Sequence, residues 1–261
     1  MTYLDLLMTA LYHGLTLTWP LCVDLATDRL FQWAADPVVG PMMKALCGIG
    51  AGLAMIVLLN RELRILFRSA YLAVKRRQEG SFGPLLMLLA GSLPVVALDI
   101  IAIPNPLSLG WMAASLLVAV GLAFLAADRL GVTVRDLDHL SLASYLIIWL
   151  LQAAGGILGI AIQITTIILA RLMGCERNQA LKLAWLFAIP HLLLGVRDLI
   201  LAPTAPPGLD ALLIGTMSFA AALIGGSVLL TWLKRKGFTA FAVTQIIIGL
   251  VMVLSVSSFG R

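Results

Sequence analysis

The stretch LDLLMTALYHGLTLTWPLCVDLATDRLFQW, residues 4–33, is mostly apolar but is interrupted near its middle by Pro20. A second stretch, LSLASYLIIWLLQAAGGILGIAIQITTIILARLMG, residues 140–174, is built in the same way, with three glycines between residues 155 and 159. A helix rises about 1.5 Å per residue, so each half of either stretch is too short to cross a hydrocarbon core about 30 Å thick. Irregular backbone at membrane depth is tolerated only where protein or a water-lined cavity covers it. Both stretches are therefore predicted to be re-entrant helical hairpins whose tips meet at a central site.

The composition is that of a membrane protein. Of the 261 residues, 61% are hydrophobic and 12% are charged, and the mean hydropathy is +1.02. Soluble domains carry about 25% charged residues. The net charge of +5 lies in loops and requires no nucleic-acid partner, and the three scattered cysteines give neither a metal-binding spacing nor a disulfide framework. We therefore expect no metal and no cofactor. The start of the chain has no basic n-region, so its first apolar run is expected to be retained.

Six further apolar segments are long enough to span a bilayer. They are residues 38–59, 82–103, 111–127, 178–201, 209–232 and 238–257. Residues 60–79 interleave cations with apolar side chains at helical spacing, which predicts a helix lying at the membrane surface. Residues 128–139 are read as a polar loop. The prediction is an all-α polytopic membrane protein, a single domain over residues 1–261 with two re-entrant hairpins and six transmembrane helices.

Each half of the chain contains one hairpin followed by three spans, with repeat 1 over about residues 1–127 and repeat 2 over about 140–258. Because three is odd, the second hairpin enters from the opposite face, which predicts an inverted-topology repeat with a site near the midplane. This topology places fourteen of the 18 lysines and arginines on one face, which should be cytoplasmic. If residues 140–174 crossed the membrane once instead, the 18 lysines and arginines would be divided ten to eight between the two faces. Both termini are thereby predicted to lie outside the cytoplasm.

Short motifs along nearly the whole chain resemble those of one known family. They are Gly14-Leu15-Thr16 with Pro20, Leu93-Pro94-Val95-Val96, Leu172-Met173-Gly174, Phe187-Ala188-Ile189-Pro190 and Lys234-Arg235-Lys236-Gly237-Phe238. The chain resembles the bacitracin-resistance type of undecaprenyl-pyrophosphate phosphatase, a family with paired re-entrant hairpins and an inverted repeat of similar length. The resemblance implies this fold and a place in the bacterial inner membrane.

The residues that the resemblance links to catalysis differ in this chain. The family's Glu-Gly-x-Thr-Glu motif has glutamates at the positions of His13 and Leu17, and its Pro-Gly-x-Ser-Arg-Ser-Gly motif has an arginine at Ile162. A further family arginine corresponds to Gln245, and two serines and a histidine are also replaced. Cleavage of a pyrophosphate needs cations on the phosphoryl oxygens and a base or nucleophile. The combined loss favours a fold that was kept after the phosphatase chemistry was lost.

Eight polar residues are candidates for contact with a substrate. They are His13, Thr16, Thr18, Asp24, Gln163, Thr165, Thr166 and Arg197. Each also has a structural interpretation: His13 as a hydrogen-bonded core residue, the first two threonines as donors to carbonyls freed near Pro20, and Asp24 as a helix cap. Residues 163–166 begin a half-helix whose N-terminus would favour an anionic headgroup. Arg197 is either a contact for a lipid phosphate or an interfacial anchor.

Three functions are compatible with these patterns. The first is a non-hydrolytic protein that binds, and in one version also translocates, a polyprenyl phosphate or a similar amphiphilic lipid. The second is a diverged undecaprenyl-pyrophosphate phosphatase that uses His13, Asp24 or Arg197. The third is a structural or assembly subunit of a membrane complex. The sequence favours the first, so that no enzyme activity is expected, and leaves open a homodimer or another membrane partner.

Overall fold

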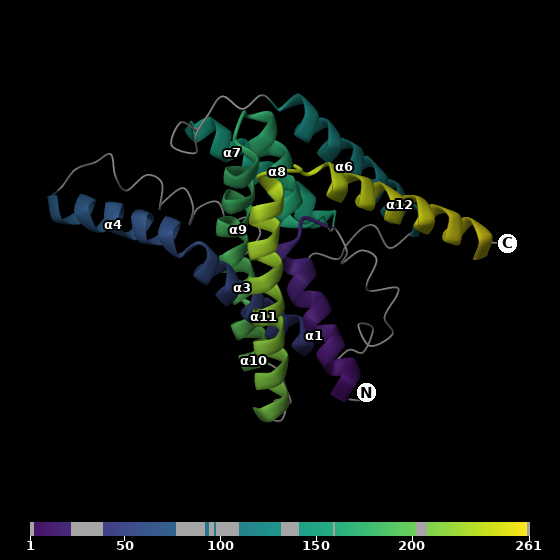
Figure 1. The fold of residues 1–261 in the computed structure, drawn as a ribbon, viewed down its shortest axis with the longest axis horizontal. Helices are drawn as coiled ribbons and strands as arrows, with labels where there is room; N and C mark the ends of the chain where they lie inside the picture. Colours follow the sequence, from purple (N-terminus) through teal and green to yellow (C-terminus); the bar gives the residue numbers. More distant parts are fainter. Residues whose placement is uncertain are drawn as a thin grey trace.

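The fold is known from a computed structural model, which describes residues 3–21, 39–76, 92–93, 97, 110–131, 141–158, 160–201 and 208–259. Its helices, in chain order, are α1 (Tyr3–Thr18), α3 (Val39–Leu58), α4 (Asn60–Arg76), α6 (Gly110–Leu130), α7 (Leu142–Ile157), α8 (Ile162–Leu172), α9 (Arg177–Leu193), α10 (Gly195–Leu201), α11 (Gly208–Leu233) and α12 (Thr239–Phe259) (Figure 1). The predicted all-α class is confirmed. The second half of the first hairpin, with Asp24, and almost all of the span 82–103 lie outside the described residues, and the division into two repeats stays a prediction.

Several helices are long and apolar enough to cross a bilayer. Within the described ranges three pass this test alone, Trp111–Leu130, Arg177–Arg197 and Leu209–Leu233. A bent pair, Met42–Leu58 with Asn60–Leu72, passes it jointly, and shorter apolar helices accompany them. The chain is therefore a polytopic membrane protein.

Helix α9 forms the centre of the fold. Buried residues lie on every side of it, from Ala180 to Leu192, as expected for a helix enclosed by others. It packs against α3 and α8, and its Trp185 and Phe187 are among the largest fully buried side chains. Because α9 is central, its side chains reach the ends of the helices around it.

The interruption predicted in the second hairpin is confirmed. Helix α7 ends at Ile157 and α8 begins at Ile162, and Gln152 Nε2 donates a hydrogen bond to Thr166 Oγ1 over 2.5 Å. In one continuous helix these two residues, 14 positions apart, would be separated by about 21 Å. The chain therefore folds back on itself, and a straight crossing by residues 140–174 is excluded.

Glycines allow α1, α3 and α11 to pack closely. A Cβ atom at Gly14 would lie 2.4 Å from the carbonyl oxygen of Ser218, and one at Gly50 would lie 2.4 Å from that of Gly215. Small residues at helix contacts let backbones approach in membrane proteins. This packing lays α1 along α11, as Figure 1 shows, and carries the end of α1 toward α8.

The helix predicted over residues 60–79 is present as α4, which follows α3 after a bend of 75°, and its place at the membrane surface stays a prediction. Leu63 and Leu66 of α4 pack against the core, while Arg64 and Arg68 are exposed. Glu62 accepts a hydrogen bond from Lys182 Nζ over 2.5 Å, which fixes the start of α4 to α9. Figure 1 shows the rest of α4 extending away from the bundle.

One predicted boundary was wrong, and one predicted span has a local break near its end. Asp128, assigned to a polar loop, lies in the last turn of α6 and is buried, because partners from other helices satisfy its carboxylate. The span 178–201 is divided into α9 and α10 at Leu194, whose N–H bonds to the carbonyls of Pro190 and His191. A Cβ at Gly195 would lie 2.8 Å from the carbonyl oxygen of Ala45, so the start of α10 rests directly on α3.

Candidate functional site at the end of the first helix

The C-terminal end of α1 is held by side chains from the second half of the chain. Gln163 Nε2, in the first turn of α8, donates to Leu17 O over 2.8 Å, and Trp185 Nε1 of α9 donates to Thr18 O over 3.0 Å. The last four carbonyls of a helix have no donor within the helix. These two side chains therefore satisfy carbonyls that α1 leaves open. The predicted meeting of the two hairpins is confirmed for the end of α1 and the start of α8.

The polar residues of α1 lie within one turn of this contact. His13 is only 3% exposed, and its ring meets that of Tyr12 edge to face at 5.8 Å between centroids. Thr16 Oγ1 donates to His13 O over 3.1 Å, and Thr18 Oγ1 donates to Leu15 O over 2.9 Å. Both hydroxyl protons are thus used within α1, which leaves the hydroxyl oxygens as acceptors.

The start of α8 is polar but carries no charge. Its N-cap, Ala161, provides no side-chain hydrogen bond. Thr165 Oγ1 and Thr166 Oγ1 donate to Ile162 O over 2.9 Å and 2.7 Å. The fully buried Gln152 holds α7 against Thr166, and its Oε1 finds no donor among the described residues. These bonds fix the shape of the hairpin tip.

The structure does not bring every predicted residue to this place. Arg197 lies on α10, which packs on α3, and its side chain is exposed. Ile162 and Gln245, aligned above with family arginines, are both buried. Among the residues that the structure describes, no group of three or more His, Cys, Asp or Glu side chains could hold a metal ion. The assembled candidates are therefore His13, the two threonines of α1 and residues 163–166.

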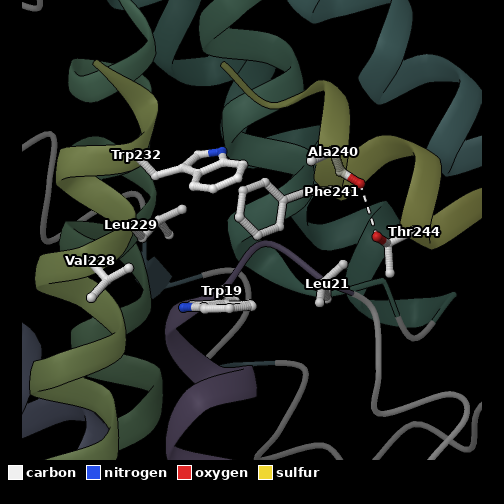
Figure 2. A pocket seen from close by; sticks show the side chains of 8 residues that line it. All are labelled: Trp19, Leu21, Val228, Leu229, Trp232, Ala240, Phe241 and Thr244. Atoms are coloured by element: carbon white, nitrogen blue, oxygen red, sulfur yellow. Dashed lines mark hydrogen bonds between the residues drawn. The ribbon is translucent and has the colours of Figure 1, made fainter. Parts of the chain in front are cut away.

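A pocket beside the end of α1 was missed by the sequence reasoning. It has a volume of about 310 Å³ and is lined by Trp19, Leu21, Val228, Leu229, Trp232, Ala240, Phe241 and Thr244. Figure 2 shows the rings of Trp19, Trp232 and Phe241 around one space. The Trp19 and Phe241 rings meet edge to face at 5.6 Å, and Trp19 Nε1 donates to Gly225 O over 3.2 Å. The sequence signal that could have indicated this pocket is an aromatic residue near each of three predicted helix ends, namely Trp19, Trp232 and Phe241.

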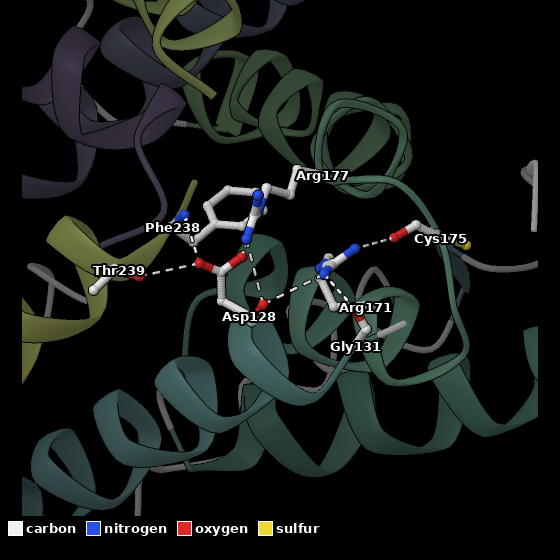
Figure 3. Close-up of polar contacts among 7 residues, drawn as sticks. All are labelled: Asp128, Gly131, Arg171, Cys175, Arg177, Phe238 and Thr239. Atoms are coloured by element: carbon white, nitrogen blue, oxygen red, sulfur yellow. Dashed lines mark hydrogen bonds and ion pairs between the residues drawn. The ribbon is translucent and has the colours of Figure 1, made fainter. Parts of the chain in front are cut away.

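A second polar cluster joins α6, α9 and α12 (Figure 3). Asp128 Oδ1 accepts from Arg177 Nε over 2.6 Å. Its Oδ2 accepts from the backbone N–H of Phe238 over 3.0 Å and from Thr239 Oγ1 over 3.2 Å. Both carboxylate oxygens are occupied by the protein itself, so this cluster is a structural clamp.

Arg171 extends the clamp to the end of α8. It is 2% exposed, and its Nη1 and Nη2 donate to the carbonyls of Cys175 over 2.6 Å and Gly131 over 2.7 Å. The guanidinium is thus surrounded by backbone oxygens, and this arrangement fixes the turn between α8 and α9.

Comparison with known proteins links this architecture to one group. Residues 24–251 match the family described as "Bacitracin resistance protein BacA". A protein of Paramagnetospirillum magneticum named "Undecaprenyl-diphosphatase 1" is 28% identical, covering 100% of this chain and 100% of the relative. Proteins named "Undecaprenyl-diphosphatase" from Synechococcus sp. and Corynebacterium glutamicum are 31% and 27% identical, each covering 85% of this chain and 82% and 79% of the relative.

Proposed function

The chain belongs to the bacitracin resistance protein BacA family, and on this basis we propose that it is an inner-membrane phosphatase acting on a polyprenyl diphosphate lipid. One observation carries the proposal: the similarity to a protein named undecaprenyl-diphosphatase extends over the full length of both chains. This similarity supports the second of the three functions considered above better than the non-hydrolytic carrier that the sequence favoured.

His13 is the residue of the candidate site that can act as a base or nucleophile. It precedes Leu17 by four positions, so both lie on the same face of α1, and Leu17 O is the atom that Gln163 binds. An imidazole ring nitrogen without a proton can act as a general base. In the proposed reaction, water attacks the terminal phosphorus as His13 takes its proton, the bond from this phosphorus to the bridging oxygen breaks, and polyprenyl phosphate leaves while the attacked group becomes inorganic phosphate.

The N-terminal end of α8 would face the substrate's anionic group. Backbone N–H groups and the helix dipole favour negative charge at such an end. Gln163 and Thr165 lie in this first turn, and the side chain of Gln163 already reaches α1. The headgroup of the lipid would therefore lie between the C-terminal end of α1 and the N-terminal end of α8. The proposed binding partner of the protein is thus this lipid.

The test is release of phosphate from undecaprenyl or farnesyl diphosphate by the purified protein in detergent, with and without divalent metal. We expect release by the wild type and a loss of about 10²-fold or more in His13→Ala, the usual range for a general base. Thr9→Ala, one turn earlier on α1 and also buried, is the matched control and should retain most activity. Wild-type protein that binds the lipid but releases no phosphate under either condition would refute the proposal.

A second candidate is a protein that binds the same lipid without cleaving it. It is favoured by the apolar residues Leu17 and Ile162 at positions where the resemblance places a glutamate and an arginine, because phosphoryl transfer normally uses such charges. Native mass spectrometry would support this candidate if polyprenyl phosphate stays bound to a protein that shows no turnover.

A further inference from the structure

The pocket beside the end of α1 is apolar and aromatic. Three of its eight lining residues are Trp19, Trp232 and Phe241, and Thr244 is the lining side chain with a hydroxyl. That hydroxyl donates to Ala240 O over 2.9 Å, as Figure 2 shows, and its proton is not available to a ligand. The pocket therefore offers aromatic faces and aliphatic groups, which suits a hydrocarbon ligand.

The pocket opens toward the outside of the helix bundle. Val228 is 52% exposed and Trp232 is 43% exposed, and both lie in the C-terminal half of α11, a helix long and apolar enough to span the membrane. Exposed side chains on such a segment face lipid chains. A hydrocarbon chain can therefore enter from the bilayer without passing through water.

The pocket also lies next to the candidate headgroup site along the chain of α1. Trp19 lines the pocket, and it directly follows Thr18, whose carbonyl binds Trp185, and lies two residues after Leu17, whose carbonyl binds Gln163. A lipid with its phosphate between α1 and α8 would thus have the first part of its chain beside Trp19. The volume of about 310 Å³ lies at the lower end for ligand pockets and accommodates a chain segment, not a whole lipid.

We propose that this pocket binds the isoprenoid segment next to the phosphate of a polyprenyl lipid. The lipid chain enters it sideways, between α11 and α12. The inference rests on the proposed function for the identity of the lipid, but it concerns binding and not cleavage. Methyl-branched, unsaturated isoprene units can pack against the three ring faces and edges, which favours them over a straight acyl chain.

The test uses two photoreactive probes on the full-length protein in nanodiscs. One is farnesyl monophosphate with a diazirine on its chain, and the other is phosphatidylglycerol with a diazirine on an acyl chain. We expect the isoprenoid probe to label residues 228–232 and 240–244 by mass spectrometry, and unlabelled undecaprenyl phosphate to compete with it. Equal or stronger labelling of these segments by the acyl probe would overturn the assignment to an isoprenoid.

Filling the pocket should remove the labelling. Val228→Trp places an indole in the lining and should lower isoprenoid labelling by about tenfold or more, an expected loss of about 1.4 kcal/mol in binding. The control is Ile224→Trp, one turn earlier on α11, where the side chain is 64% exposed and outside the lining. If Val228→Trp melts at a lower temperature than the control, Thr244→Trp replaces it as the filling variant. Unchanged labelling in a folded filling variant would overturn the inference.

This design distinguishes failure of the proposed phosphatase function from failure of the pocket assignment. The monophosphate probe has no phosphoanhydride bond, so its labelling does not depend on hydrolysis. Labelling without phosphate release from the diphosphate would overturn the proposed function alone. Phosphate release with unaltered labelling in the filling variants would overturn the pocket assignment alone.

Discussion

At the scale of single residues, the buried carboxylate of Asp128 is expected to contribute strongly to stability. It accepts three hydrogen bonds, from Arg177 and from the first residues leading into α12. Asp128→Ala would leave a buried backbone N–H and a half-exposed guanidinium without their acceptor. Removing one partner of a buried pair costs about 3–5 kcal/mol, and because Arg177 is partly exposed we expect about 2–3 kcal/mol.

Thermal unfolding in detergent, followed by tryptophan fluorescence, measures this effect. Thr239→Val removes only the 3.2 Å hydroxyl bond and should cost about 1 kcal/mol, which makes it the graded control. Equal melting temperatures for Asp128→Ala and Thr239→Val would show that the carboxylate does not join α6, α9 and α12 as described.

At the scale of elements, the glycine contacts determine how closely α1 and α3 approach α11. Gly14→Ala places a methyl group 2.4 Å from Ser218 O and 2.9 Å from Ser218 Cα, both backbone atoms that cannot move alone. We expect a loss of about 1–3 kcal/mol, as for other overpacked contacts. Gly215→Ala is the control, because a Cβ there meets nothing within 4 Å and alanine favours a helix.

The melting temperature and the amount of folded protein after extraction measure this difference. Gly14→Ala should lower both, while Gly215→Ala should leave them unchanged or raise them. Similar values for the two variants would contradict the close approach of α1 to α11.

The fold-back of α7 onto α8 makes a further prediction at this scale. In a background without the native cysteines, Gly155→Cys with Thr165→Cys should form a disulfide, because a Cβ at Gly155 would lie 3.8 Å from the Cβ of Thr165, the usual spacing across a disulfide. Mass spectrometry of the oxidised protein detects the bond. Gly155→Cys with Leu172→Cys is the control pair and should stay reduced, since Leu172 lies at the far end of α8. An oxidised control pair together with a reduced test pair would contradict the hairpin.

At the scale of the whole molecule, the charge distribution predicts the orientation in the membrane. In the topology predicted from the sequence, fourteen of the 18 cations fall on the side that includes Lys234, and that side should be cytoplasmic. Leu209 and Lys234 lie at opposite ends of α11, which is long enough to span the membrane. In intact cells, a membrane-impermeant maleimide should therefore label Leu209→Cys and not Lys234→Cys. The reverse result would place both termini in the cytoplasm.

The sequence predicted those features that depend on local pattern. The glycines before Ile162 predicted the break between α7 and α8, and the polar residues at that break predicted that Gln163 would lie at a tip. The cation spacing predicted α4. Hydropathy shows how long a helix is but not which helices touch, so it could not predict that Trp185 would bind the end of α1.

The missed features depend on contacts between distant residues. Asp128 resembles a loop residue by its charge, and only the arrival of Arg177 and Phe238 makes its burial favourable. The aromatic pocket likewise joins Trp19 to Phe241 across most of the chain. In the site, Gln163 contacts the end of α1, as the predicted meeting of the hairpins requires, whereas Arg197 lies on α10.

The hydrogen bond from Trp19 to Gly225 bridges 206 positions of sequence, and this span has a consequence for biogenesis. A ribosome adds about 5–20 residues per second, so about 10–40 s pass between the synthesis of these two residues. Throughout that interval the newly inserted first helix has a free indole inside or beside the bilayer, where water is scarce. Its two open carbonyls are satisfied only when Gln163 and Trp185 follow, 146 and 167 positions after their partners. Until the later helices arrive, the insertion machinery or a membrane chaperone must shield these groups, and a chain that terminates early should be a substrate for quality-control proteases.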